Sequence, residues 1–148
     1  MSGSTPFTSE IAALAERLAL LEAEREIMRT LHDYGYALDY GDVEAFLDCW
    51  LPDAAMYWPI PPYGAPFKGH DGLRKAFDGH THAPAIYHKH FVVDPRIAVT
   101  GDVARVESYF TRLDTDKDGP YMRGYGRYID VLQRCPDGRW RLDRKSVV

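Results

Sequence analysis

The chain has 148 residues, a formal net charge of −4 and two cysteines. This length suits one domain with a hydrophobic core, and the acidic balance argues against a nucleic-acid partner. Two isolated cysteines exclude a disulfide framework and a thiolate zinc site. No apolar run is long enough to span a membrane, and "MSGSTPFTSE" lacks the features of a signal peptide. We therefore expect a cytoplasmic protein with no membrane partner.

Residues 1–8 are expected to form a flexible leader, and residues 9–148 a single domain. From Ser9 onward, apolar residues recur at helical spacing, which predicts one long helix or two helices joined by a kink near residues 22–24. Gly41 is expected to end this helix, and Asp42 to cap a short helix over residues 43–50. The two apolar rows of the long helix are Ile11, Leu14, Leu18, Leu21 and then Ile27, Leu31, Tyr34, Leu38.

The rest of the chain is predicted to be rich in strands. Residues 54–60 read as a strand, 61–69 as a proline-rich loop and 70–79 as a helix. Strands follow near 86–99, 102–114, 120–134 and 138–147, with turns at 100–102 and 136–138 and a polar loop at 114–119. Helices followed by antiparallel strands predict an α+β fold, with helices on one face of a curved sheet.

The segment "YHKHFVVDP" (87–95) carries two histidines on a predicted strand. Alternate side chains of a strand share a face, so His88, His90 and Val92 should point one way, and Tyr87, Lys89, Phe91 and Val93 the other. The first group is a candidate pocket wall. With His80 and His82 the chain holds two H-x-H pairs, but no carboxylate has a suitable fixed spacing, and we expect no metal site.

The closing strand contains the pattern "RWRLDRKS" (139–146). Trp140 and Leu142 define its inner face, and strict alternation places Arg144 inward with them, whereas Lys145 falls on the solvent face. A buried arginine needs an anionic or carbonyl partner; a structural salt bridge is the alternative to a functional role.

The end of the long helix offers Asp39 and Tyr34. On an ideal helix these two side chains are about 140° apart, so they share a pocket only if the helix end bends or the phenol reaches around. A solvated aspartate and a core tyrosine are the structural alternatives.

These segments, in this order, resemble the SnoaL-like group of the nuclear transport factor 2-like superfamily. The resemblance runs from about residue 18 to the end and is carried by "GYALDYGDVEAFLDCWLPDAAMYW", "FKGHDGLRKAF", "HFVVDPRIAVTGDVARVESYF" and "DGRWRLDR". It implies a cone-shaped sheet, antiparallel or mixed, wrapped around the N-terminal helices. A closer pattern is similar to scytalone dehydratase, bile-acid 7α-dehydratase and hexachlorocyclohexane dehydrochlorinase, which use a histidine–aspartate dyad in an elimination.

The resemblance implies site residues for this chain. Asp39 and His90 match the dyad, Arg144 a closing-strand arginine, and Tyr34 the active-site tyrosine of the bile-acid enzyme. Leu38 stands where scytalone dehydratase has a tyrosine, and that enzyme's second histidine has no clear counterpart, which puts the substrate in doubt. His90 is the expected proton-transfer residue, while His88 should lie nearer the pocket mouth and be dispensable. The other expected substrate-binding residues are Phe110, Arg112, Tyr128 and Trp58.

The leading hypothesis is a cofactor-independent lyase, of dehydratase type, for a small cyclic apolar substrate such as a steroid, polyketide or aromatic. An isomerase or cyclase of the same fold is the first alternative; a non-catalytic module, like the small subunit of ring-hydroxylating dioxygenases, is the second. Tyr87, Phe91 and Val93 would form an outer apolar patch, extended by Tyr125, Ile129 and Val131, that predicts an oligomer. The resemblance suggests a trimer, with a dimer as the alternative.

Overall fold

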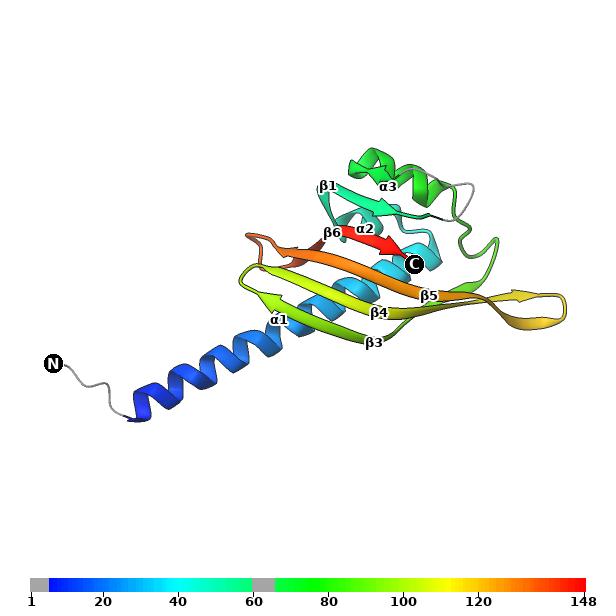
Figure 1. Cartoon of the computed structure of the whole chain (residues 1–148). Coiled ribbons are helices and arrows are strands. Elements are labelled where there is room, and N and C mark those ends of the chain that lie inside the picture. Colours follow the sequence, from blue (N-terminus) through cyan, green and yellow to red (C-terminus); the bar gives the residue numbers. More distant parts are fainter. Residues whose placement is uncertain (1–5, 60–65) are drawn as a thin grey trace.

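The computed structural model describes residues 6–59 and 66–148. Three helices and six strands follow one another along these residues (Figure 1). In chain order they are α1 (Pro6–Tyr40), α2 (Val43–Asp48), β1 (Trp50–Tyr57), β2 (Phe67–Lys68), α3 (Gly69–Asp78), β3 (His88–Thr100), β4 (Val103–Asp116), β5 (Gly119–Arg134) and β6 (Trp140–Val147).

The first helix is continuous, without the kink considered near residues 22–24. It begins at Pro6, inside the segment expected to be a leader; residues 1–5 lie outside the described residues. Gly41 ends it with a φ of +75°, a conformation that glycine adopts without steric cost. The Asp42 carboxylate then accepts a hydrogen bond of 3.0 Å from the Ala45 amide, which caps α2 as expected.

The six strands form one mixed sheet in the order β2-β1-β6-β5-β4-β3. β1 and β6 run parallel, and the other neighbours run antiparallel. The expected strand at 54–60 starts earlier, at Trp50, and its last expected residue, Ile60, lies outside the described residues. Only residues 117–118 separate β4 from β5, because the strands extend into most of the polar loop expected at 114–119. The α+β fold with a curved mixed sheet is thus confirmed.

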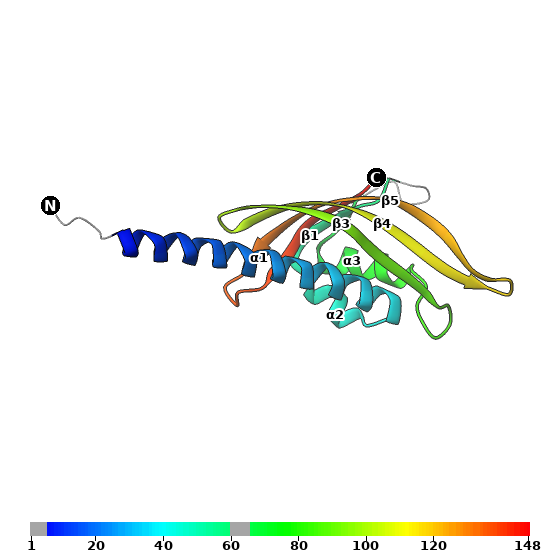
Figure 2. The ribbon, with the colours of Figure 1, turned by 90° about the horizontal axis from the view of Figure 1, so that it is seen from below.

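All three helices lie against one face of the curved sheet (Figure 2). The core forms between them, and its largest fully buried apolar members include Trp50, Trp140, Phe46, Ile27, Leu31 and Leu73. The second apolar row of α1 faces this core, whereas its first row does not: Leu14 and Leu18 are exposed. None of the described helices is both long and apolar enough to cross a membrane.

The inner face of β6 differs from the one that strict alternation predicts. Leu142 pairs with Leu132 of β5, but Arg144 pairs with Val131, so Asp143 is an extra residue in the ladder. Such a bulge shifts the alternation by one position. Lys145 is therefore completely buried, and Arg144 is exposed, with its guanidinium 6.0 Å from the Tyr57 ring centre. The prediction that Arg144 points inward and Lys145 outward is wrong.

Lys145 forms a buried ion pair with Asp130 of β5, with 2.8 Å between Nζ and Oδ2. Its ammonium lies 3.7 Å from the Tyr128 ring centre and 4.7 Å from that of Tyr34. Burial raises the pKa of Asp130 and lowers that of Lys145, while each charge opposes the shift of the other. These residues and the surrounding aromatic rings pack in the core between the helices and the curved sheet.

Candidate functional site

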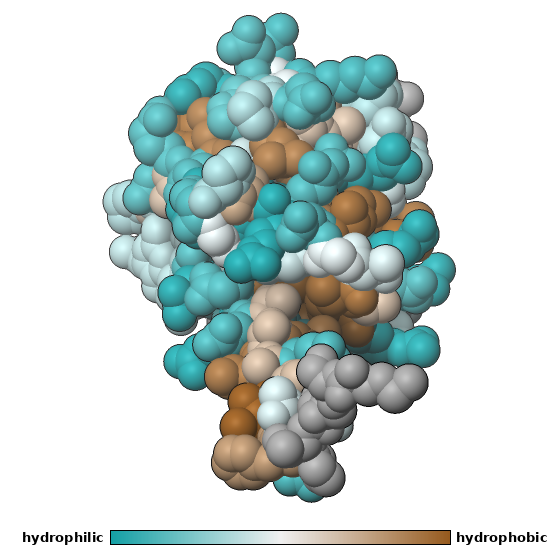
Figure 3. All heavy atoms as spheres, turned by 90° about the vertical axis from the view of Figure 1, so that its left-hand side faces the viewer, coloured by the Kyte–Doolittle hydropathy of each residue, from teal (hydrophilic) through white to brown (hydrophobic). Residues whose placement is uncertain are grey.

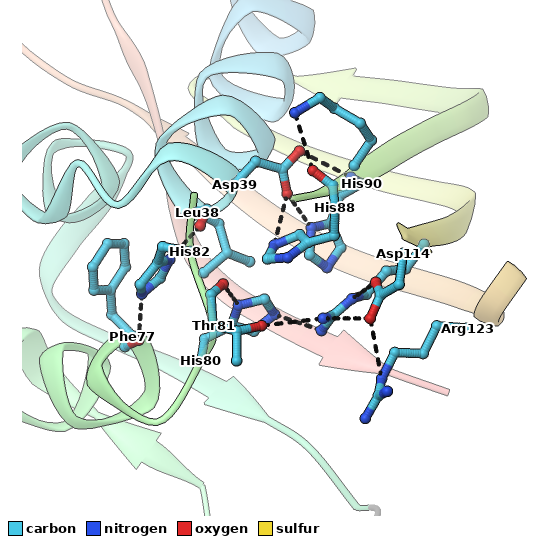
Figure 4. A network of polar contacts seen from close by, with 12 residues as sticks. Leu38, Asp39, Phe77, His80, Thr81, His82, His88, His90, Asp114 and Arg123 are labelled. Carbon is cyan, nitrogen blue, oxygen red and sulfur yellow. Dashed lines mark hydrogen bonds and ion pairs between the residues drawn. The ribbon is translucent and has the colours of Figure 1, made fainter. Parts of the chain in front are cut away.

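The hydrogen bond expected between Asp39 and His90 is present. Asp39, near the end of α1, is 3% exposed, and its carboxylate faces the start of β3. The Nδ1–H of His90 donates to Asp39 Oδ1 over 2.6 Å, and the His90 backbone amide donates to Oδ2 over 3.0 Å (Figure 4). With Nδ1 held as a donor, the neutral imidazole keeps its lone pair on Nε2. The carboxylate thus fixes both the orientation and the tautomer of His90.

The first half of β3 follows the predicted alternation, because its bulge, at Asp94 (φ +49°), comes only after the histidines. His88, His90 and Val92 face inward, whereas Tyr87 and Phe91 are 57% and 46% exposed. His88 is not at a pocket mouth, however: its side chain is fully buried, with Nε2 3.3 Å from Asp39 Oδ1. This placement is a correction, and it makes His88 a second neighbour of the same carboxylate.

Arg112 of β4 lies directly opposite His90 in the sheet. It is held by Asp114, with Nε 2.6 Å from Oδ1 and Nη2 3.0 Å from Oδ2, and Nη2 also donates to Thr81 Oγ1. Such a two-pronged carboxylate contact fixes the plane of the guanidinium. Arg112, one of the expected substrate-binding residues, is thus a fixed cation opposite His90, whereas Arg144 is exposed.

His80 lies in the segment that follows α3 and contacts Arg112 of the site. The spacing of residues in the sequence does not predict this contact. Its Nδ1 donates to the Thr81 carbonyl over 2.7 Å, and its Nε2 accepts from Arg112 Nη1 over 3.1 Å. The loop between α3 and β3, residues 79–87, contacts the end of α1: the Ala83 amide donates a hydrogen bond of 3.0 Å to the Asp39 carbonyl. Burial lowers the pKa of His80 to about 3 and that of His88 to about 4, so both rings stay neutral near pH 7.

Three histidines are the side chains best placed to hold a metal ion. One ring nitrogen from each of His80, His88 and His90 lies within 4.8 Å of the others. The available nitrogen of His80 already accepts from Arg112, whose positive charge would lie beside a bound dication. Because like charges repel strongly in a poorly solvated site, this arrangement suits an anionic or carbonyl oxygen better than a metal ion.

Two hollows are bordered by residues of the cluster. One, of about 260 Å³, is bordered by His80 and Arg112 together with Trp58, Met56 and Phe67. The other, of about 210 Å³, lies between α1 and β3 and is bordered by Asp39 and His90. The expected pocket residues Trp58 and Arg112 thus line a cavity, and the dyad lies within reach of another.

The remaining expected pocket residues pack against other aromatic rings of the core. Tyr34 packs in the aromatic core, with ring centres 5.5 Å from Phe46 and 5.9 Å from Trp50. Burial raises its pKa far above the ordinary value, so the phenol stays protonated. Phe110 and Tyr128 stack on each other at 4.3 Å. Tyr34 is therefore a core tyrosine, and Arg144 is exposed beside Tyr57 instead of pointing into the core.

Residues 19–146 match the family model described as the SnoaL-like domain. A comparison with curated proteins finds no match.

Several solved structures are similar. An NTF2-like protein with a cystatin-like fold from Novosphingobium aromaticivorans is 26% identical, with a TM-score of 0.81 over 99% of this chain and 90% of that one. A protein from the same organism put forward as a scytalone dehydratase is 25% identical, with a TM-score of 0.70 over 87% of this chain and 84% of that one. ActVI-ORFA from Streptomyces coelicolor, at 20% identity, has a TM-score of 0.73 over 84% of this chain and 95% of that one, and supports the fold alone.

Proposed function

Because this chain belongs to the SnoaL-like domain family, which includes polyketide cyclases and dehydratases, we propose that it is a cofactor-independent lyase that dehydrates a small cyclic β-hydroxy carbonyl compound. The observation that carries the proposal is the hydrogen bond of 2.6 Å between Asp39 and His90. Among the described residues, none forms a hydrogen bond with the second imidazole nitrogen, which can therefore act as a base. A carboxylate in this position stabilises the imidazolium that forms when the ring takes a proton.

The reaction divides into two proton transfers. His90 Nε2 removes a proton from the carbon next to the carbonyl, and the electrons of that C–H bond move onto the carbonyl oxygen to give an enolate. The enolate then re-forms the carbonyl and a carbon–carbon double bond while the bond to the β-hydroxyl breaks. The imidazolium returns its proton to the departing oxygen, so the products are an unsaturated carbonyl compound and water, and His90 is neutral again.

Arg112 is the group best suited to stabilise the enolate oxygen. Among the described residues, four of its five N–H groups are used by Asp114, Thr81 and His80, which leaves one on Nη1 for a substrate oxygen. Donors that are already fixed in place favour the transition state, because they need no reorganisation as charge develops. The anchoring by Asp114 supplies that rigidity.

The hollow beside Arg112 limits the size of the part of the substrate that carries the carbonyl; His90 borders the other hollow, and its ring centre lies 5.2 Å from that of His80, which borders this one. Its volume of about 260 Å³ lies at or below the lower end of the ~300–1,000 Å³ typical of small-molecule sites. Trp58, Met56 and Phe67 give it an apolar wall. Both features favour one or two fused rings, as in an aromatic or short polyketide, over a four-ring steroid.

Two other functions share parts of this evidence. An isomerase or cyclase would use the same base but return the proton to carbon. A non-catalytic binding module is favoured by the filled core between the helices and the sheet, where the Tyr34 ring contacts those of Trp50 and Tyr128. Exchange of the acidic α-hydrogen for deuterium separates both enzymes from the binding module, since it requires the base, and the loss of water then separates the lyase from the isomerase or cyclase.

The test uses a panel of mono- and bicyclic β-hydroxy ketones, with the unsaturated product followed by its absorbance and α-deuterium exchange by NMR. His90→Gln should lower kcat/KM by about two to four orders of magnitude. Asp39→Asn should cost somewhat less, and the double variant no more than His90→Gln, because residues that act as a unit are not additive. His88→Gln should cost about tenfold at most, through its contact with Asp39.

The matched control is His70→Gln on α3, whose ring lies 3.3 Å from the Trp50 carbonyl and outside the cluster. It should keep the activity of the unaltered protein. Full activity in His90→Gln would contradict the mechanism. Equal large losses in His88→Gln and His90→Gln would favour a metal site instead, and elemental analysis for zinc and iron would then test that alternative.

A further inference from the structure

The first half of α1 carries large apolar side chains that the rest of the described protein leaves uncovered. We call them the outer stripe: Phe7, Ile11, Leu14, Leu18 and Leu21, which are 51–70% exposed. This half of the helix projects beyond the sheet in Figure 1, and apolar surface gathers at that end of the molecule in Figure 3. A continuous row of this kind marks an interaction site more often than scattered surface leucines do.

The outer stripe faces away from the body of its own chain. At 3.6 residues per turn, its mean direction lies about 150° from that of Ile27, Leu31, Tyr34 and Leu38, the row that packs into the core. α1 is continuous across both rows. The sheet that covers the second row therefore cannot also cover the first, so a partner for the outer stripe has to come from outside the described residues.

The spacing within the stripe points to a second helix as that partner. Successive members are four, three, four and three residues apart, which is the a and d pattern of a two-stranded coiled coil. Thr8 and Ala15 flank the stripe on one side and are small enough for close approach. Glu10 and Arg17 flank it on the other side and carry opposite charges.

Charge also argues against a lipid surface. Residues 7–25 contain four glutamates and two arginines, a net charge of −2. Amphipathic helices that bind anionic membranes carry lysine and arginine on the polar face instead. A second copy of the same helix offers both the apolar row and the complementary charges.

We propose that two copies of this protein associate through the outer stripes of antiparallel α1 helices. In this alignment Ile11 packs against Leu14 of the second copy, Phe7 against Leu18, and Glu10 lies beside Arg17. In a parallel pair, Arg25, the next position of the pattern, would instead face Arg25 of the second copy, and the two like charges would repel each other. Leu18 and Leu21 also border a groove of about 640 Å³ that reaches Trp140, so the antiparallel alignment brings Phe7 of the second copy to its mouth.

This interface is independent of the proposed activity and of any assembly through the outer sheet face. The first test is the mass of the full chain, measured by sedimentation over the micromolar range, for the unaltered protein, Leu14→Asp and Leu20→Asp. Leu20 is the matched control: it is 46% exposed on the same half of α1 but points about 140° away from the stripe. Circular dichroism checks that each variant is folded.

Leu14→Asp should halve the mass, from dimer to monomer or, if the sheet face forms trimers, from hexamer to trimer. Leu20→Asp should leave it unchanged. Equal masses for the unaltered protein and Leu14→Asp would overturn the proposal. So would an unaltered monomer that cosediments with phosphatidylglycerol vesicles, because the stripe would then belong to a lipid surface.

Charge reversal tests the orientation. Glu10→Arg and Arg17→Glu should each weaken association by about two- to thirtyfold, since each breaks two symmetric surface pairs. The double variant Glu10→Arg/Arg17→Glu should restore it. Restoration by Arg17→Glu/Glu22→Arg instead would show a parallel pair and overturn the antiparallel alignment.

Discussion

The buried pair between Asp130 and Lys145 allows a sharp test of how β6 faces the core. Lys145 is 0% and Asp130 1% exposed, so Lys145→Met leaves a carboxylate in the core without its cation. Removing one partner of a buried pair typically costs about 3–5 kcal/mol. The loss of the cation–π contacts with Tyr128 and Tyr34 adds to this cost.

The double variant Asp130→Val/Lys145→Met removes both charges and keeps a strand-compatible side chain on β5. Replacing a buried pair by apolar side chains is often neutral or stabilising, so the double variant should recover most of the stability lost by Lys145→Met. Asp130→Val alone should be destabilised to a similar degree, because it leaves the ammonium unpaired. The double variant thereby shows that the substitutions themselves are tolerated in the core.

The assay is urea unfolding at pH 7, followed by tryptophan fluorescence. With a denaturant slope of about 1–3 kcal/mol per molar, a loss of 3–5 kcal/mol moves the midpoint down by one molar or more. Arg144→Met is the control on the neighbouring residue and should change the stability by less than about 0.5 kcal/mol. If Arg144→Met cost more than Lys145→Met, the register of β6 described above would be refuted.

Three further predictions concern the core and the site. Gly126→Ala should destabilise the fold by about 1–3 kcal/mol, because its Cβ would lie 2.5 Å from the Val148 carbonyl oxygen and 2.8 Å from the Phe110 ring. Gly124→Ala is the control and should not destabilise the fold, because open space surrounds that position. Thermal unfolding measures both. Tyr34→Phe should keep kcat/KM within about tenfold, because Tyr34 packs in the core; a loss as large as that of the dyad variants would return it to the site. The free energy of unfolding should fall as the pH drops from about 6.5 towards 4. The pKa values of His80 and His88 are lower in the folded protein than in the unfolded chain. The unfolded chain therefore binds more protons in this pH range and becomes more favourable. In His88→Gln the melting temperature should depend less on pH, and an unchanged dependence would contradict this assignment.

The sequence predicted the positions that depend on local periodicity. His88, His90 and Val92 share the inner face because β3 is regular up to its bulge at Asp94. The pairing of His90 with Asp39 came from the family resemblance, and the geometry bears it out. Alternation failed on β6, where a bulge at Asp143 moves every later residue to the opposite face. A bulge is a property of strand pairing, which composition and spacing along one strand do not reveal.

The position of Arg112 also depends on contacts that the pattern along one element does not predict. Arg112 was expected among the substrate-binding residues and Arg144 in the catalytic set, but only Arg112 lies opposite His90, where Asp114 and His80 hold it in position. His80 reaches this point only because its loop is fastened to the end of α1, a contact between segments more than 40 residues apart. Periodicity determines which way a side chain points within its own element, whereas a site needs groups from several elements at once. The dyad was expected only from the family resemblance, and the guanidinium beside it depends on the register between two strands and on the path of a loop.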